Sequence, residues 1–326
     1  MAVYTKLTFN QISNFIDNYN IGQLKKFDEI VAGIDNSNFI IHTTQDKFIL
    51  TIFEARIKEQ DIPYFINLKA HLSTNNISCP KPLIAKNNQT INKINNKNAV
   101  IVTFLKGRTL APRKDGYYDN INTKHCAQIG QVTAKMHLAA NNFTLNRHND
   151  LDRQGLIDLI AKIDDNLDIF EPNLSVKIIE NLQFIKNNWQ NDLPHGAIHA
   201  DLFPDNVFFN DDNNLAGVID FYFAANDLFI YDLAIVINAW CFDCNNQFNQ
   251  QKFISLINSY SQIRPLSKEE GKFLPIALRC ASMRFLITRI YDYFNTPKDS
   301  IVNVKDPKEY VQKLNYFINN GANLIN

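Results

Sequence analysis

The chain has 326 residues with 33 basic and 33 acidic side chains, so its formal net charge is zero. A neutral chain of this length can bury a large core, and it has no overall basic field that would attract nucleic acid or an anionic membrane. We see no apolar leader segment and no membrane-length apolar stretch, and five cysteines suit a reducing compartment, so we expect a cytoplasmic protein without a membrane span.

The first hundred residues predict a β-rich lobe with one or two helices. Phe9 to Tyr19 has a helical period, and a second helix is predicted over 57–72. Apolar runs bounded by turn residues predict strands that together form a sheet, at 30–33, 39–43, 48–53, 91–94 and 99–105.

The sequence becomes mostly helical after Lys106-Gly107-Arg108. Helices are predicted over 126–137, 156–167, 176–189, 231–242, 253–260, 273–293 and 307–318. The helix at 231–242 is strongly apolar, so we expect it to be buried. The fold class is therefore α+β and bilobal, with residues 1–105 as an antiparallel-sheet N-lobe and residues 106–326 as a larger, mainly helical C-lobe.

Cys241 and Cys244 form a C-x2-C spacing inside the region of that apolar helix. Zinc and redox sites of this kind normally use a second pair, which the chain lacks, so the spacing favours two ordinary thiols over a metal or redox site.

The most informative segment lies between His199 and Asp220. Asp201 is followed five residues later by Asn206, and Asp220 comes after a short apolar run, a turn cluster at 211–214 and a second apolar run. This pattern predicts a β-hairpin whose antiparallel return would place Asn206 and Asp220 side by side. An amide oxygen and a carboxylate suit Mg²⁺, and Asp201 is left to face an acceptor hydroxyl. The alternative interpretation is an acidic surface hairpin that binds nothing.

With these residues the chain resembles the aminoglycoside phosphotransferase and choline kinase superfamily, which has a protein-kinase-like bilobal fold. The motifs that carry the resemblance are His199 to Asn206, Ile219-Asp220-Phe221, and the segment Gly130 to His137. Within the superfamily, strings such as Asn238-Ala239-Trp240-Cys241 are most similar to the bacterial homoserine kinases. The resemblance extends over nearly the whole chain.

The resemblance implies a reaction and a set of roles. The γ-phosphoryl group of ATP would pass to the side-chain hydroxyl of L-homoserine and give O-phospho-L-homoserine, a precursor of threonine. Asp201 would orient that hydroxyl and accept its proton late, while Asn206 and Asp220 would hold Mg²⁺. His199 would brace the loop. The cofactors implied are ATP and Mg²⁺.

The nucleotide side of the site is less clearly marked. Gly33, Asn36 and Ser37 lie in a predicted loop that could offer backbone N–H groups to phosphate, although a plain hairpin turn would look the same. Phe104 and Leu105 end a strand that either meets adenine or is an ordinary core strand.

One position departs from the kinase pattern. Thr51 occupies the place where kinase-like enzymes usually have a phosphate-binding lysine, so the compensating charge must come from elsewhere. Lys47 and Arg56 lie at the ends of the strand, and nothing in the sequence selects either. Glu59 and Asp61 are both candidates for the usual helix glutamate.

A zwitterionic acceptor needs a cation for its carboxylate, and Arg284 and Arg289 are the candidates because a guanidinium binds carboxylate bidentately. They are five positions apart, about 140° around a helix, so we expect only one to face the pocket. The alternative is that both form structural ion pairs, for example with Asp292 or Asp232. Asp232 is expected to tie the magnesium-binding loop to the following helix.

Tyr222 and Trp240 are candidates for the acceptor pocket, and aromatic core packing explains them about as well. Other acceptors remain open: methylthioribose, choline, ethanolamine or an aminoglycoside. From a different class, Thr51 would suit an inactive nucleotide-binding module, but such a module has no need to retain Asp201, Asn206 and Asp220 together. The expected partner is a small amino-acid substrate, and the chain is expected to be a monomer or homodimer without nucleic acid.

Overall fold

The computed structural model describes residues 4–30, 36–55, 57–110, 118, 120–163, 166–296 and 304–324. The chain divides into two compact units. The first is Met1–Lys106 together with Ala216–Tyr222, and the second is Gly107–Leu215 together with Phe223–Asn326. The short segment Ala216–Tyr222 therefore packs with the N-terminal part of the chain although it lies far along the sequence.

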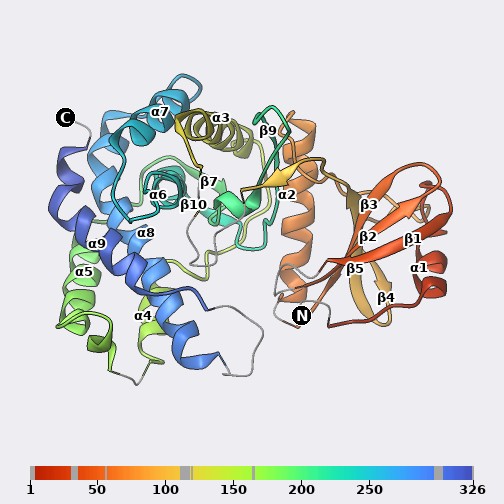
Figure 1. Cartoon of the computed structure of the whole chain (residues 1–326), viewed down its shortest axis with the longest axis horizontal. Helices are drawn as coiled ribbons and strands as arrows, with labels where there is room; N and C mark the ends of the chain where they lie inside the picture. The colour runs from red at the N-terminus through yellow and green to blue at the C-terminus, as the bar shows by residue number, and fades with distance from the viewer. Residues whose placement is uncertain are drawn as a thin grey trace. The chain divides into compact units, whose positions relative to one another are not determined.

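The first unit contains an antiparallel five-stranded sheet in the order β1-β2-β3-β5-β4, drawn in red to yellow in Figure 1. The α+β prediction is thereby confirmed. Its elements are α1 (Phe9–Ile16), β1 (Leu24–Ile30), β2 (Asn36–Thr43), β3 (Lys47–Phe53), η1 (Glu59–Asp61), α2 (Ile62–Thr74), β4 (Asn92–Ile94) and β5 (Lys97–Thr103).

The structure describes a first strand that the sequence pattern did not predict. Of the strand predicted at 30–33, Ile30 belongs to β1, and residues 31–33 lie outside the described part of the chain. The segment Leu24–Ile30 carries charged residues because β1 is an edge strand, and much of it is exposed. Hydrophobic periodicity is therefore weak there.

The sheet has an apolar layer on each face. Ile12 and Phe15 of α1 belong to one buried cluster with Phe39, Leu50 and other strand residues. Ile62 and Ile66 of α2 belong to another cluster with Val100 and Val102 of β5. A capping box between Thr8 and Gln11 starts α1. Alternate residues of one strand thus pack against different helices, as the two-residue period of a strand requires.

The second unit is mainly helical, with α6 near the middle of the other helices (Figure 1). All twelve residues of α6 are buried, as predicted for this apolar segment. Gly130 of α3 lets α7 approach closely, because a Cβ there would lie 2.4 Å from the carbonyl oxygen of Leu256. The helices are α3 (Thr123–Ala140), α4 (Arg153–Ile160), η2 (Leu167–Ile169), α5 (Leu174–Asn188), η3 (Pro204–Asn206), α6 (Phe229–Trp240), α7 (Gln250–Ser261), α8 (Lys268–Asn295), α9 (Lys308–Asn320) and η4 (Gly321–Asn323).

Short strands position the loops of this unit. Sequence analysis did not identify β7 (His195–Ile198) or β10 (Ala225–Leu228), which pair antiparallel, with Asp227 opposite Gly196. β7 leads directly into the segment that contains His199, and β10 leads into α6. Four residues are too few to show a clear period.

The strands of the predicted hairpin are present as β8 (Val207–Phe209) and β9 (Leu215–Val218). The turn between them is closed by a hydrogen bond from the backbone N–H of Asn210 to the carbonyl of Asn214, and Asn213 adopts a positive φ of 54°. β6 (Arg108–Thr109) pairs with β8. Among the described helices, none is both long and apolar enough to cross a membrane.

Candidate active site

Asp201 and Asn206 lie together in the loop that follows β7. The side-chain N–H groups of Asn206 donate to the backbone carbonyl of Asp201 at 2.8 Å and to its Oδ2 atom at 3.2 Å. Asn206 is buried at the end of η3. Because its nitrogen is used in this way, the side-chain oxygen of Asn206 is left for another ligand.

The loop backbone is held by a buried carboxylate. Asp232 of α6 accepts hydrogen bonds from the backbone N–H of Ala200 at 2.8 Å and of His199 at 3.1 Å. Ala200 has a φ of 62°, in the left-handed region that residues with a Cβ seldom adopt. Asp232 therefore ties the segment immediately before Asp201 to α6.

Asp232 is itself part of a buried polar chain. His137 Nε2 lies 3.1 Å from Asp232 Oδ2, and the other ring nitrogen lies 2.8 Å from the hydroxyl of Tyr260. Arg264 donates to that hydroxyl and to Glu270, each at 2.9 Å. Burial lowers the pKa of His137, and Asp232 offsets this only in part. A neutral His137 with its proton on Nε2 satisfies the whole chain.

The protonation of the two aspartates differs. Burial would raise the pKa of Asp232, but its bonds to His137 and to the loop N–H groups outweigh burial and lower it. Burial raises the pKa of Asp201, and the charge of Arg284 opposes this without cancelling it. Asp232 is thus a fixed anion, whereas Asp201 is shifted in the direction that favours accepting a proton.

Arg284 lies beside the loop. It is 1% exposed, and its Nη1 group donates a hydrogen bond to the backbone carbonyl of Ala200. Its guanidinium also lies over the ring of Phe285, 4.7 Å from the centroid. The hydrogen-bond partner of this predicted substrate-binding residue is therefore the protein backbone.

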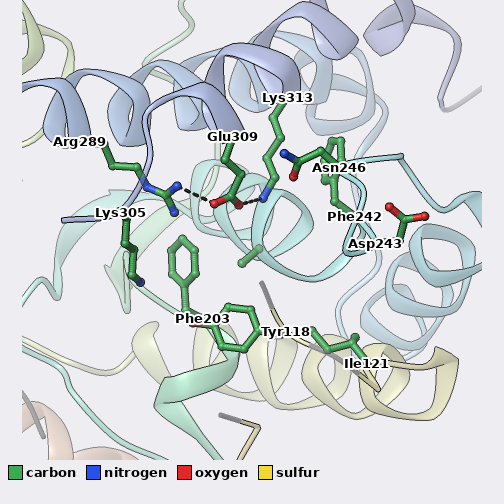
Figure 2. Close-up of a pocket in the computed structure, with 11 residues that line it drawn as sticks. Tyr118, Ile121, Phe203, Phe242, Asp243, Asn246, Arg289, Lys305, Glu309 and Lys313 are labelled. Atoms are coloured by element: carbon green, nitrogen blue, oxygen red, sulfur yellow. Dashed lines mark hydrogen bonds and ion pairs between the residues drawn. The ribbon is translucent and has the colours of Figure 1, made fainter. Parts of the chain in front are cut away.

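Arg289 belongs to a different cluster, shown in Figure 2. Its Nη1 atom lies 2.5 Å from Glu309, which also pairs with Lys313 at 2.6 Å. Burial would raise the pKa of Glu309, but the two cations lower it to about 2. The ion pair predicted as an alternative does occur, with Glu309 in place of the acids considered from the sequence.

A small cavity adjoins this cluster and the loop. Its volume is about 20 Å³, and its wall includes Phe203, two residues after Asp201, together with Lys305 near the mouth. Figure 2 shows the charged side chains reaching toward it from α8, α9 and the segment before α9. The other lining residues are Tyr118, Ile121, Ala239, Phe242, Asp243, Asn246, Arg289, Glu309 and Lys313.

The two aromatic candidates have different surroundings. Trp240 is fully buried, and its indole N–H donates to the carbonyl of Leu202 at 2.8 Å. It therefore supports the loop from α6. Tyr222 lies in the first unit, with ring contacts to Phe53 and Phe65.

The predicted phosphate-side residues are joined into the sheet of the first unit. Ser37 donates to Glu54 at 2.6 Å and accepts from the backbone of Tyr4 and Thr5, and Lys97 also pairs with Glu54. Asn36 accepts a hydrogen bond from the backbone N–H of Glu54 at 3.3 Å. Gly33 and Arg56 lie outside the described residues.

The other two candidate regions of the first unit are also packed. Thr51 donates to Asn38 at 2.7 Å across β2 and β3. Phe104 and Leu105 follow β5 and are half-buried, and Lys47 lies 5.7 Å from the Phe104 ring centroid. Gly217 makes room for Leu105, because a Cβ on Gly217 would lie 2.8 Å from that side chain.

Asp220 has a positive φ of 63° and shares the first unit with a buried lysine that sequence analysis missed. Lys69 of α2 is 6% exposed and lies over the ring of Tyr222, 5.6 Å from its centroid. Burial lowers the pKa of Lys69 to about 8, and the charges of Cys79 and Asp220 oppose that change. A lysine within the apolar stripe of a helix was the signal that could have identified it.

No group of three or more His, Cys, Asp or Glu side chains suited to a metal occurs in the described residues. The free side-chain oxygen of Asn206 suits a hard divalent ion that takes part of its coordination from water or phosphate.

An antiparallel five-stranded sheet in one unit, and a loop that carries Asp201 and Asn206 among the helices of the other, define a phosphotransferase of the protein-kinase-like class. Residues 26–266 match the phosphotransferase enzyme family, and the chain belongs to this family.

Curated relatives support a narrower grouping. A protein of Bradyrhizobium named homoserine kinase is 42% identical over 316 residues, covering 97% of this chain and 94% of the relative. A homoserine kinase of Bartonella henselae is 44% identical over 322 residues, covering 99% and 98%. Among solved structures, the amicoumacin kinase hAmiN, in complex with AMP-PNP and Ca²⁺, has a TM-score of 0.69 at 15% identity, with 96% and 93% of the two chains covered.

Proposed function

We propose that this protein transfers the γ-phosphoryl group of ATP to the side-chain hydroxyl of L-homoserine and forms O-phospho-L-homoserine. The observation that carries the acceptor assignment is the similarity to relatives named homoserine kinase over nearly the whole chain. The half-buried carboxylate of Asp201, fixed by Asn206, supports the chemistry.

Asp201 orients the acceptor hydroxyl and takes its proton as the new O–P bond forms. An alcohol is far too weak an acid to be deprotonated beforehand by a carboxylate, so orientation is the larger contribution. Asn206 restrains both the backbone carbonyl and one carboxylate oxygen of Asp201. This restraint limits the rotation of the carboxylate that must meet the hydroxyl.

Asn206 and Asp220 are the proposed Mg²⁺ ligands, and each brings one of the oxygen types that this ion prefers. The support within the second unit is the Asn206 amide, whose nitrogen is bonded to Asp201 and whose oxygen is therefore the free end. When bound, the ion would offset negative charge on the phosphate oxygens.

The charged cluster beside the loop is the proposed site for the amino-acid end of the acceptor. Three cations line the cavity, Arg289, Lys305 and Lys313, against the two acids Glu309 and Asp243, so the lining carries one net positive charge. An excess of buried positive charge favours an anion such as the substrate carboxylate.

The acceptor must open this cavity, since about 20 Å³ holds no more than a water molecule. Lys305 is a residue that could move, because its side chain is 46% exposed, and in moving it would leave its 3.7 Å ion pair with Asp205. Arg284 takes no part in this proposed contact.

An acceptor screen tests the function directly. With Mg-ATP present, release of ADP is measured with L-homoserine, methylthioribose, choline, ethanolamine and kanamycin. We expect turnover with homoserine and a product that carries phosphate on its side-chain oxygen. Activity with choline and none with homoserine would refute the acceptor assignment and leave the family assignment intact.

Asp201→Asn tests the role of the carboxylate. The substitution retains the shape and the bond to Asn206 but removes the proton acceptor, so we expect kcat to fall by about 10³-fold or more. Circular dichroism and thermal unfolding check that the fold is retained. A folded variant with an unchanged kcat would exclude Asp201 as the base.

Lys305→Met tests the proposed carboxylate contact. We expect the KM for homoserine to rise about tenfold while kcat and the KM for ATP change less than about threefold. Lys308→Met is the matched control, because Lys308 is an exposed neighbour of the same segment. Equal effects of the two substitutions would argue against a specific role of Lys305.

A further inference from the structure

The peptide units around Ala200 are gripped from two sides by buried charges. Asp232 of α6 accepts from the N–H of Ala200, and Arg284 of α8 donates to its carbonyl. Both charged side chains are at most 1% exposed. Ala200, which makes both contacts, has a left-handed φ of 62° and immediately precedes Asp201.

The environment of Arg284 suits a fixed structural contact at the loop. In the described part of the chain, no carboxylate forms an ion pair with this guanidinium, and its Nε atom is buried without a hydrogen-bond partner. The rings of Phe223 and Phe285 lie 5.4 and 4.7 Å from the guanidinium carbon. The charge of Arg284 also attracts the Asp201 carboxylate at longer range. Its direct hydrogen bond is to the backbone carbonyl of Ala200.

The conformation of Ala200 requires such support. Residues with a Cβ populate the left-handed region poorly, so the loop would relax toward a commoner backbone conformation if its carbonyl were released. Rotation of the peptide after Ala200 would turn the Asp201 side chain away from its present direction. Asp232 holds the N–H side of the residue, and the N–H of the following peptide makes a long hydrogen bond of 3.3 Å to the His199 ring. Arg284 is the side chain that holds the carbonyl of that following peptide.

We propose that Arg284 is a positioning residue that locks Ala200 in its left-handed conformation and thereby aims the Asp201 carboxylate at the acceptor. This inference rests on the proposed role of Asp201 as the base. It replaces the expectation from the sequence that Arg284 binds the substrate carboxylate. Arg284 acts through the loop backbone and does not touch the substrate.

Glycine at position 200 provides a specific test, because glycine adopts the left-handed conformation without the steric penalty. We expect Arg284→Met to lower kcat about 100-fold, since a misaimed catalytic group costs about that much, with both KM values changed less than about threefold. Ala200→Gly alone is the reference against which the double variant is compared. Ala200→Gly added to Arg284→Met should recover kcat at least about fivefold.

The controls separate positioning from other roles. Arg279→Met changes another arginine of α8, one that bonds Asn181 and stacks on Phe184, and should leave kcat within about threefold. If Arg284→Met does not fold, Arg284→Lys retains the charge without the planar donor, and Ala200→Gly is tested in that background. A raised KM for homoserine with unchanged kcat, or no recovery with glycine, would overturn the proposal.

A second measurement keeps this result independent of the acceptor assignment. Hydrogen exchange of the peptide spanning 199–206 should become at least about tenfold faster in the arginine variant and slower again when glycine is added. If homoserine is inert in the acceptor screen, the kinetic series uses whichever acceptor is active, and without one the exchange result alone decides. An unchanged rate of amide hydrogen exchange in a folded Arg284 variant would refute the proposal that Arg284 holds Ala200 in its left-handed conformation.

Discussion

Two buried charges, Asp232 in the second unit and Lys69 in the first, have opposite surroundings. In the second unit, Asp232 accepts hydrogen bonds from two backbone N–H groups and from His137. In the first unit, Lys69 is buried against the ring of Tyr222, and within the described chain no hydrogen bond satisfies its ammonium group. A satisfied buried charge fixes structure, whereas an unsatisfied one costs stability and is retained for another reason.

The conformation of the catalytic loop depends more on buried charges that are satisfied by hydrogen bonds than on the loop's own sequence. Apart from its link to Asn206, the loop is held by α6 and α8, whose contacts reach the backbone at His199 and Ala200. The His137 ring stacks on Phe229 and extends the support into the helical core. The position of the predicted base is therefore set largely by residues that never meet the substrate.

Asp232→Asn is expected to have the largest effect, because it removes the satisfied buried anion. One carboxylate oxygen that accepts from a backbone N–H or from His137 becomes an amide donor, which leaves buried donors facing each other. We expect unfolding free energy to fall by about 3–5 kcal/mol and kcat to fall by about 10³-fold. Urea unfolding and steady-state kinetics measure the two effects.

Asp158→Asn is the matched control for that experiment, because Asp158 is exposed on α4 and bonds only Gln154 among the described residues. It should change stability by less than about 0.5 kcal/mol. A folded Asp232→Asn protein with normal kcat would show that the loop holds its conformation without the buried anion.

Glu309 extends the comparison to a second satisfied charge in the helical unit. Its pKa is about 2 in the folded protein and 4.5 in its ordinary state. The unfolded chain therefore binds more protons between these values, so the contribution of Glu309 is complete above about pH 4.5 and declines as the pH falls toward 2. Glu309→Gln should lower stability by about 2–3 kcal/mol at pH 7.

The pH dependence of that difference is the useful measurement. Urea unfolding of both proteins from pH 7 down to pH 3 should show the gap between them narrowing below about pH 4.5. The facing charges of Arg289, Lys313 and Lys305 stay positive throughout this range and cannot produce the change. A gap that is constant with pH would mean that Glu309 has an ordinary pKa in the folded protein.

Much of the secondary structure around the candidate site was predictable from the sequence, because short local segments encode it. The spacing from Asp201 to Asn206 and the turn at Asn213 are features of one short segment. The apolar run of α6 predicts that this helix is buried. The hairpin and the buried helix could be predicted for this reason. The α+β class followed from the same periodicities.

The supports of the site could not be predicted, because they join distant positions. The contact from Arg284 to Ala200 spans 84 residues, and the guanidinium pairs with a backbone carbonyl that any residue would provide. β7 and β10 are short strands whose pairing brings Asp227 opposite Gly196. A residue type at a given position carries no signal for either contact.

Lys69→Met is the smallest and most direct test of the contrast, because it removes a buried charge from the other unit. Burial holds the pKa of Lys69 near 8, below the ordinary 10.5, so the unfolded chain binds more protons between these values and stability rises with pH across that window. Methionine fills a similar volume without the charge and should therefore raise the unfolding free energy by about 1–3 kcal/mol at pH 7.

The thiol of Cys79 and the carboxylate of Asp220 interact with the same ammonium group. Cys79→Ser is therefore made in both the parent and the Lys69→Met protein, so that the effect of the lysine is measured without the thiol. Urea unfolding at pH 7 and pH 10 measures the change, and the gain should shrink at the higher pH. Loss of stability in Lys69→Met would mean that this lysine is satisfied after all, and the two buried charges would then be held alike.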